Sequence, residues 1–284
     1  MAVMRRLGLL CFIAVGFSTV SHASFEMLLV PDATNTRISR FDPINAVGLG
    51  GYSLGASRTF ITDQGGFSYS YSAATGRFSV HDYSTGMLVG NTSAAVSTVA
   101  GLSTTSSGGF VFGAGNQFRE LTTLGALGPV TRATISTMAN IGSITSAGSD
   151  YWFVLGKDFV GNMMMATVDK TTYAVTTSSI SIATVDAVLG TAAVHLAANG
   201  TRSLSFAFRT AGGVFMRTVS LSSNGTISDG STDNLPGYST TTNSVVNAVS
   251  AHNGFWFVGR DSGGTLTRLS LYDADNIPNV QSTY

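Results

Sequence analysis

The chain is poor in charged residues and in cysteine. Of its 284 residues, 11% are charged, and the formal net charge is zero. Phosphate binding needs a basic surface stripe, so this balance argues against nucleic acid as a partner. The single cysteine, Cys11, lies in an apolar N-terminal run, which leaves the rest of the chain without disulfides or cysteine-based zinc sites.

Residues 1–23 have the three regions of a secretory signal peptide. Arg5 and Arg6 precede an apolar run that is shorter than the ~20 residues of a membrane span, and Ala23 ends a stretch of small residues suited to cleavage. We expect a mature chain of residues 24–284 that is secreted or periplasmic and has no integral membrane segment. Cleavage would remove Cys11 and two of the 15 basic residues against 15 acids, for a net charge near −2.

Residues 65–90 form the clearest structural unit. Phe67, Tyr69 and Tyr71 alternate with serines, which is the period of a strand with one aromatic and one small polar face. A turn ending at Gly76 follows, then a second apolar run, a second turn and the start of a third strand. The pattern predicts an antiparallel meander.

Copies of this unit recur along the chain. One lies 40 residues earlier without a gap, and looser copies begin near Phe110, Tyr151, Leu204 and Phe255. A period of about 40–45 residues with several short strands is typical of propeller blades, which bury both faces only by packing on one another. We therefore predict an all-β fold, a single β-propeller of about six four-stranded antiparallel blades.

Four soft runs of small residues lie between the copies, at residues 94–102, 134–144, 185–196 and 244–251. We interpret them as innermost strands, because small side chains suit the crowded axis of a propeller; short helices are the alternative. The first copy has no such run before Phe25. Residues 277–283 either close the ring beside the N-terminal strands, form the outer strand of the last blade, or fray.

The stretch at residues 29–43 resembles the repeat of NHL and YVTN-type β-propellers. An apolar strand leads to Asp32, a turn, the pair Arg37-Ile38 and the ending Phe41-Asp42. The second unit keeps Arg77, Phe78 and Asp82, whereas Gln117-Phe118 replaces the Arg-Ile pair in the third. The resemblance implies a propeller along the whole chain. It leaves function open, because such families include binding proteins and a minority of enzymes.

Two sets of aspartates recur at fixed places in the unit. The first set ends second apolar runs, and its members are Asp42, Asp82, Asp169 and Asp273. Paired carboxylates can hydrolyse glycosides, but a catalytic residue should be singular, so we assign the set to turn capping. The second set follows first apolar runs, and its members are Asp32, Asp158 and Asp261. Calcium loops and hairpin turns both use such residues, and the turn is the simpler interpretation.

The remaining candidates for chemistry are scattered. The histidines outside the leader are His81, His195 and His252, which fall on different predicted blades, so no metal-ligand spacing is present. The acids outside the repeated pattern that matter most are Glu120, Asp150 and Asp186. An enzyme would bring several of these groups together. Aromatic residues that would stack on sugars if exposed are expected in the core between blades: Tyr69, Tyr71, Trp152 and Trp256.

From the sequence we predict no catalytic, cofactor-binding or metal-binding residues. The favoured function is an exported, non-catalytic binding or surface-associated module with an unidentified protein or carbohydrate ligand. Two alternatives stay open: a carbohydrate-active hydrolase or lyase on a propeller scaffold, and a self-associating structural or adhesive surface protein.

Overall fold

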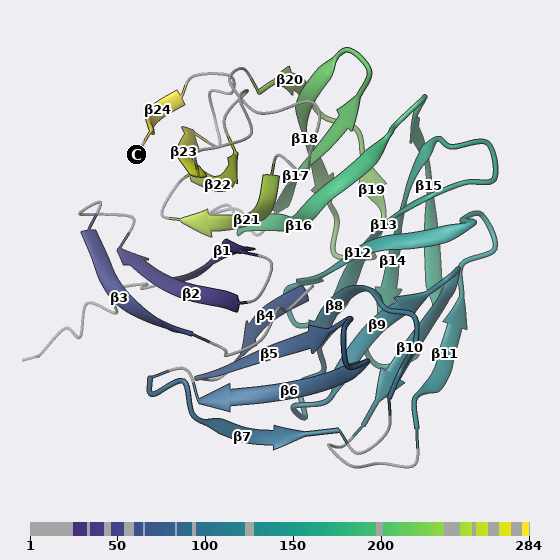
Figure 1. The fold of residues 1–284 in the computed structure, drawn as a ribbon. Coiled ribbons are helices and arrows are strands. Elements are labelled where there is room, and N and C mark those ends of the chain that lie inside the picture. Colours follow the sequence, from purple (N-terminus) through teal and green to yellow (C-terminus); the bar gives the residue numbers. More distant parts are fainter. Residues whose placement is uncertain are drawn as a thin grey trace, which may run out of the picture.

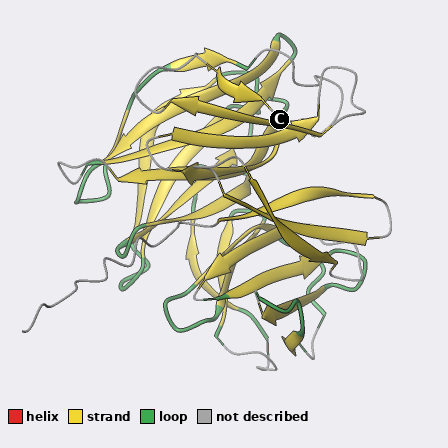
Figure 2. Ribbon diagram, turned by 90° about the vertical axis from the view of Figure 1, so that its left-hand side faces the viewer, coloured by secondary structure: helices red, strands yellow, loops and turns green. Residues whose placement is uncertain are grey.

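The computed structural model describes most of the chain from Phe25 onward, and every regular element in the described part is a strand (Figure 2). Side-chain surroundings are described only between residues 66 and 235, apart from Ser53. The described residues are 25–32, 35–42, 47–53, 60–64, 66–82, 84–92, 95–122, 128–196, 201–235, 245–251, 254–260, 267–273 and 280–283. The predicted leader, residues 1–23, lies outside them.

The strands form six separate antiparallel sheets, numbered here as blades 1 to 6 in chain order. Blade 1 contains β1 (Phe25–Asp32), β2 (Asn35–Asp42) and β3 (Val47–Ser53). Blade 2 contains β4 (Phe60–Gln64), β5 (Phe67–Ser72), β6 (Arg77–Asp82) and β7 (Leu88–Asn91). Blade 3 contains β8 (Ala100–Thr104), β9 (Phe110–Ala114), β10 (Gln117–Leu121) and β11 (Val130–Thr134).

The second half of the chain repeats this arrangement. Blade 4 contains β12 (Asn140–Ala147), β13 (Tyr151–Lys157), β14 (Met163–Asp169) and β15 (Val175–Ile182). Blade 5 contains β16 (Ala187–Leu196), β17 (Arg202–Thr210), β18 (Gly213–Leu221), β19 (Ile227–Ser228) and β20 (Thr232–Asn234). Blade 6 contains β21 (Val245–Ala251), β22 (Gly254–Arg260), β23 (Thr267–Asp273) and β24 (Val280–Thr283).

The six sheets stand around a common centre (Figure 1). The first strands of neighbouring blades contact one another in the series β4–β8–β12–β16–β21, and β21 in turn contacts β1. β16 and β21 lie within the soft runs at 185–196 and 244–251, whereas β8 and β12 overlap only the ends of the runs at 94–102 and 134–144. The prediction of innermost strands is confirmed for the first pair and in part for the second, and the described residues of all four runs contain no helix. The molecule is an all-β propeller with six blades, as the repeat predicts.

Each four-stranded blade is a meander that starts at the axis, so its turns alternate between the two ends of the ring. We call the end with the first and third turns the odd-turn face, and the end with the second turns and the links between blades the even-turn face. On the even-turn face, Val96 in the β7–β8 link donates its N–H to the carbonyl of Gly76 in the β5–β6 turn, at 2.7 Å.

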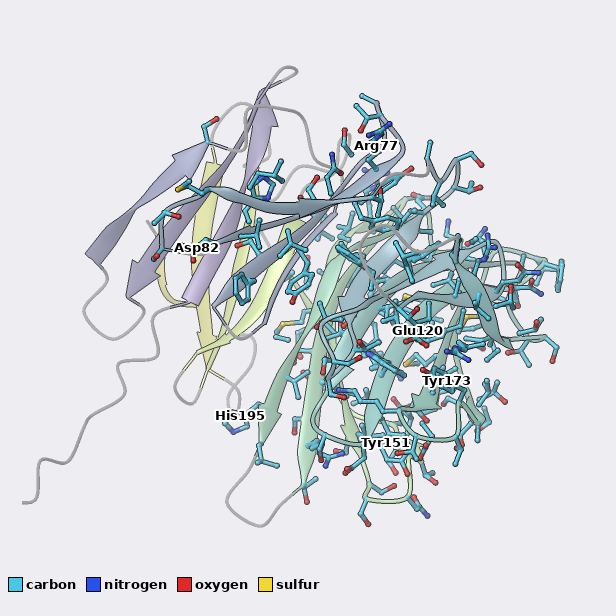
Figure 3. The ribbon with its side chains drawn as sticks, turned by 90° about the horizontal axis from the view of Figure 1, so that it is seen from below. Arg77, Asp82, Glu120, Tyr151, Tyr173 and His195 are labelled. Atoms are coloured by element: carbon cyan, nitrogen blue, oxygen red, sulfur yellow. The ribbon has the colours of Figure 1, made fainter. Side chains whose placement is uncertain are left out.

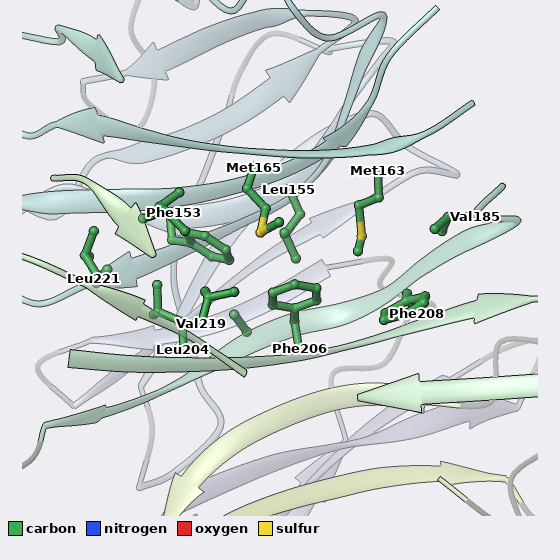
Figure 4. Close-up of a cluster of buried hydrophobic side chains, with 13 residues drawn as sticks. Phe153, Leu155, Met163, Met165, Val185, Leu204, Phe206, Phe208, Val219 and Leu221 are labelled. Carbon is green, nitrogen blue, oxygen red and sulfur yellow. The ribbon is translucent and has the colours of Figure 1, made fainter. Parts of the chain in front are cut away.

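The second strands of blades 2 to 5 are buried on both sides because a sheet packs on either face. On β13, Trp152 belongs to the apolar cluster shared with blade 3, whereas Phe153 belongs to the cluster shared with blade 5. Figure 4 shows Phe153 facing Phe206 of β17 across this second interface. On β5, the tyrosine face packs against blade 3, and Ser68 and Ser70 on the opposite face are 0% exposed. The predicted small polar face is thus also interior.

Three parts of the chain settle how the outer blades and edge strands are built. β24 pairs with β23 as the outer strand of blade 6, not with the N-terminal strands, so the clasp alternative is wrong. Blade 1 has three strands, consistent with the missing soft run before Phe25. Beyond Ser222, the chain contains β19 and β20, which both pair with β18; the outer strand of blade 5 is therefore split in two.

Candidate functional site

The repeated aspartates whose side chains are described are turn caps, as predicted. The Oδ1 atom of Asp82 accepts the N–H groups of Ser84 and Thr85 at 3.0 and 2.8 Å, and also both hydroxyls. The hydroxyl of Ser84, followed by the N–H and hydroxyl of Thr85, lowers the pKa of Asp82 to about 2. These carboxylates are occupied by their own turns, which removes them as catalytic candidates.

Asp169 repeats this geometry in blade 4. Its Oδ1 atom accepts the N–H groups of Thr171 and Thr172 at 2.8 and 2.7 Å. The side chains of Asp42 and Asp273, which end β2 and β23, lie outside the described set.

Asp158 of the second set holds the β13–β14 turn. Its Oδ1 atom accepts the N–H groups of Val160 and Asn162 at 2.9 and 2.8 Å, and its Oδ2 atom accepts the side-chain amide of Asn162. Desolvation alone would raise the pKa of Asp158, but these hydrogen bonds together lower it. The hairpin-turn interpretation is confirmed for Asp158. The side chain of Asp32 and the whole of Asp261 lie outside the described set.

Glu120 on β10 is the most buried of the singular acids, at 5% exposure. Its Oε2 atom accepts hydrogen bonds from Arg132 Nε at 2.7 Å and from the Tyr173 hydroxyl at 2.5 Å. Arg132 also lies 5.1 Å from the centre of the Tyr173 ring. Burial, and then the bond to Glu120, raises the pKa of Tyr173 to about 12. These three side chains link blade 3 to blade 4, and the charges of Glu120 and Arg132 are paired with each other.

Asp150, on the odd-turn face, forms a second and separate ion pair. Its Oδ2 atom lies 2.8 Å from Arg202 of blade 5, and hydrogen bonds from Ser149 and then Arg202 lower its pKa. Lys170 donates to Ser146 Oγ and to the carbonyl of Gly148, both at 2.6 Å. These contacts tie the β12–β13 and β14–β15 turns together.

Within the described residues, the singular acids and histidines therefore do not converge. Asp186 belongs to the β15–β16 link on the even-turn face, opposite Asp150, and its carbonyl accepts Lys157 Nζ at 2.5 Å. His195 lies on inner strand β16, apart from Glu120 in Figure 3. His81 is buried on β6. His252 is outside the described set. Among the described residues, no three His, Cys, Asp or Glu side chains gather as a metal site would require.

Two features escaped the sequence analysis. Residues 51–55, Gly-Tyr-Ser-Leu-Gly, match the GxSxG spacing of a nucleophile elbow. Ser53 is the last residue of the outer strand β3 in an all-β sheet, and the residues that follow it, 54–59, lie outside the described set. The second feature is the pair Phe159-Val160 in the β13–β14 turn, whose side chains are 77% and 80% exposed. The sequence signal for this exposed pair was the presence of two apolar residues inside an Asp-x-x-Gly-Asn turn.

The aromatic residues predicted in the core are there wherever their side chains are described. Tyr69, Tyr71 and Trp152 are 6%, 2% and 1% exposed. Trp152 Nε1 donates to the carbonyl of Thr104 across the interface between blades 3 and 4, at 3.1 Å. None of the three is available to stack on a sugar. In the described part of the chain, no helix is long and apolar enough to span a bilayer.

Comparison with known proteins shows the fold of this chain but assigns it to no family. No family model and no curated protein matches the sequence. Among solved structures, a chain of the nidogen–laminin complex is similar with a TM-score of 0.60 and 9% identity, over 91% of this chain and 92% of that one.

Two further similar structures are those of enzymes. Luciferin-regenerating enzyme has a TM-score of 0.55 at 10% identity, over 77% of this chain and 72% of that one. Virginiamycin B lyase from Staphylococcus aureus has a TM-score of 0.52 at 12% identity, over 92% and 85%. Identities this low show the fold alone. The likenesses agree with the six sheets: this chain is a β-propeller, as its resemblance to NHL and YVTN-type repeats implies.

Proposed function

We propose that the chain is an exported binding module that recognises a partner protein through the even-turn face of its propeller. The observation that carries the proposal is the exposure of Phe159 and Val160 at the tip of the β13–β14 turn. Burying one large apolar side chain contributes about 1.5–3 kcal/mol, so two adjacent ones form a credible anchor for a protein surface.

The turn is held in place before any partner arrives. Asp158 accepts two backbone N–H groups of the turn, and Lys157 fastens the preceding strand end to the β15–β16 link. A preorganised loop loses little conformational entropy on binding, which favours affinity. The separate, internally paired positions of Glu120 and Asp150 support a binding role over glycoside hydrolysis, which needs two carboxylates flanking one bond.

The partner and the location are parts of the same proposal. The similar chain of the nidogen–laminin complex was solved in a protein complex, which makes a protein partner reasonable for this scaffold and adds nothing about its identity. Export follows from the leader-like residues 1–23, which precede the first blade.

Cross-linking on cells that make the chain tests the proposal. The wild-type chain, a Phe159→Ser/Val160→Ser variant and a Leu196→Ser control are recovered from the exported fraction, and cross-linked proteins are identified by mass spectrometry. Leu196 is 65% exposed at the opposite, odd-turn end of β16, so it controls for loss of an exposed apolar side chain.

We expect at least one protein to be captured by the wild type and the control but not by the double variant, with the recovered chain starting at Ser24. Capture that is identical for all three chains would contradict the role of this turn. Failure to recover the chain outside the cytoplasm would contradict export.

A further inference from the structure

A second exposed apolar surface lies on blade 2, well separated in the chain from the Phe159 turn. Met87, Leu88 and Val89, at the start of outer strand β7, are 69%, 57% and 58% exposed. The register of β7 on β6 shifts between Val80 and His81, so a β-bulge interrupts the normal alternation of sides. Three consecutive large apolar side chains are thereby left in solvent beside an unpaired strand edge.

The outer strands of blades 3 to 5 are better protected than β7. Open edges are normally blunted by charge, proline, shortness or polar side chains. β11 carries Arg132 and follows Pro129, β15 exposes serine and threonine, and β19 has two residues. β7 has four residues and is protected only by this shortness and by its bulge.

The charge pattern around β7 indicates which partner fits. Residues 83–91, which include β7 and the turn before it, contain no Asp, Glu, Lys or Arg, and the charged residues of the neighbouring strand β6, Arg77 and Asp82, lie at its two ends. In a contact across a twofold axis, residues near the axis meet their own copies, so a charge there would face a like charge. A surface for a different protein has no such restriction and usually keeps a charged rim. The uncharged edge at residues 83–91 therefore favours a second copy of the same chain.

We propose that the β7 edges of two copies pair antiparallel about a twofold axis near Val89, forming a homodimer. The pairing satisfies the free backbone groups of both edges and covers Leu88 and Val89 of each copy. It also places the two Asp82 carboxylates at opposite ends of the joint. This inference is independent of the proposed function, because it uses a different blade and different residues.

Cysteine substitution tests the geometry directly. In a Cys11→Ser background, Val89→Cys introduces the only cysteine of the chain. Directly opposite residues of an antiparallel pair have Cα atoms about 4.5–5.5 Å apart, within the range of a disulfide. We expect Val89→Cys to form a disulfide-linked dimer on mild oxidation at micromolar concentration. Val160→Cys, at a still more exposed valine on blade 4 (80% against 58%), should stay mainly monomeric.

Analytical ultracentrifugation measures the association without cross-linking. For the wild-type chain we expect the weight-average mass to rise toward twice the monomer value between about 1 and 100 µM, the range of a small interface. Val89→Lys, which places two like charges at the axis, should weaken the dimer by about tenfold or more. Val160→Lys should leave it unchanged, and circular dichroism should show both variants folded.

A wild-type chain that stays monomeric throughout this range would overturn the proposal. So would a dimer that is insensitive to Val89→Lys, or one weakened equally by Val160→Lys. Because Val160→Lys disturbs the proposed partner surface and Val89→Lys disturbs the proposed dimer edge, failure of either idea is distinguishable from failure of the other.

Discussion

At the residue scale, the turns after β6 and β14 share an aspartate cap but differ in the residue that adopts positive φ. Asp82 and Asp169 both accept the N–H groups of the residues two and three positions later. The residues four positions later, Gly86 and Tyr173, both have positive φ, at 71° and 59°. Glycine adopts this conformation without strain, whereas a residue with a Cβ pays about 1–2 kcal/mol. At Tyr173 the strain is offset by the bond to Glu120 and by stacking on Trp152 at 5.9 Å.

The cap at Asp82 predicts a stability change in acid. Its pKa is lowered from 3.8 to about 2 in the folded state, so its contribution is present above pH 3.8 and is lost as the pH falls toward 2. We expect Asp82→Ala to be less stable than wild type near neutral pH, and the difference to shrink over this acid window. Urea unfolding across the pH range measures it.

Asp82→Asn is the matched control, because its amide oxygen can still accept the N–H groups of Ser84 and Thr85. It should keep most of the stability while losing the pH dependence. An equal difference between wild type and Asp82→Ala above and below the window would show that ionised Asp82 does not stabilise the turn.

At the element scale, the inner strands approach so closely that side chains are excluded at their contact. Gly101 in β8 has a φ of 74°, and a Cβ built on it would lie 2.8 Å from the backbone nitrogen of Ile144 in β12. This is backbone against backbone, which cannot yield as a flexible side chain would. The contact explains why the soft runs near the axis contain small residues.

Gly101→Ala is therefore expected to destabilise the protein by more than the strained backbone conformation alone would. Strain at positive φ and crowding against β12 together should lower the free energy of unfolding by about 3 kcal/mol. Gly115→Ala, with a φ of 60° and no atom within 4 Å, should lose about 1 kcal/mol. Denaturant unfolding of the two variants compares them. Equal losses would show that the approach of β8 to β12 is not tight.

At the scale of the whole molecule, adjacent blades in the described region are held together by shared apolar clusters and by several hydrogen bonds between them. The clusters between blades 2 and 3, 3 and 4, and 4 and 5 are each made by residues from both sides. The Glu120–Tyr173 hydrogen bond adds a polar latch at the second of these interfaces.

Removing this latch should weaken the ring. Tyr173→Phe is expected to lower the free energy of unfolding by about 1.5–3 kcal/mol, because a hydrogen bond to a charged and buried carboxylate is lost. Tyr151→Phe is the control in the same blade, since its hydroxyl makes only an exposed bond of 3.4 Å to the carbonyl of Ser223. Thermal and denaturant unfolding give both values, and similar losses would mean that Tyr173 adds little to the joint.

Much of the fold was predictable because local pattern carries it. The alternation around Tyr69 and Tyr71 marks a strand, and its recurrence gives the blades and the position of nearly every second strand. The caps at Asp82 and Asp169 were also predictable, since they bond within their own turns. The exposure of Phe159 and of Met87 to Val89 was not predictable. The sequence pattern around an apolar residue in a turn or edge strand is the same whether or not another blade covers that residue.

The sequence by itself determined the repeating meander, the inner strands and the turns, because these depend on the period of side chains and on bonds between residues a few positions apart. Only the tertiary structure decided that β24 is an outer strand, that Glu120 of one blade meets Tyr173 of the next, and that the singular acids stay apart. Those outcomes depend on how sheets stack around an axis, which sets distances between residues far apart in the chain.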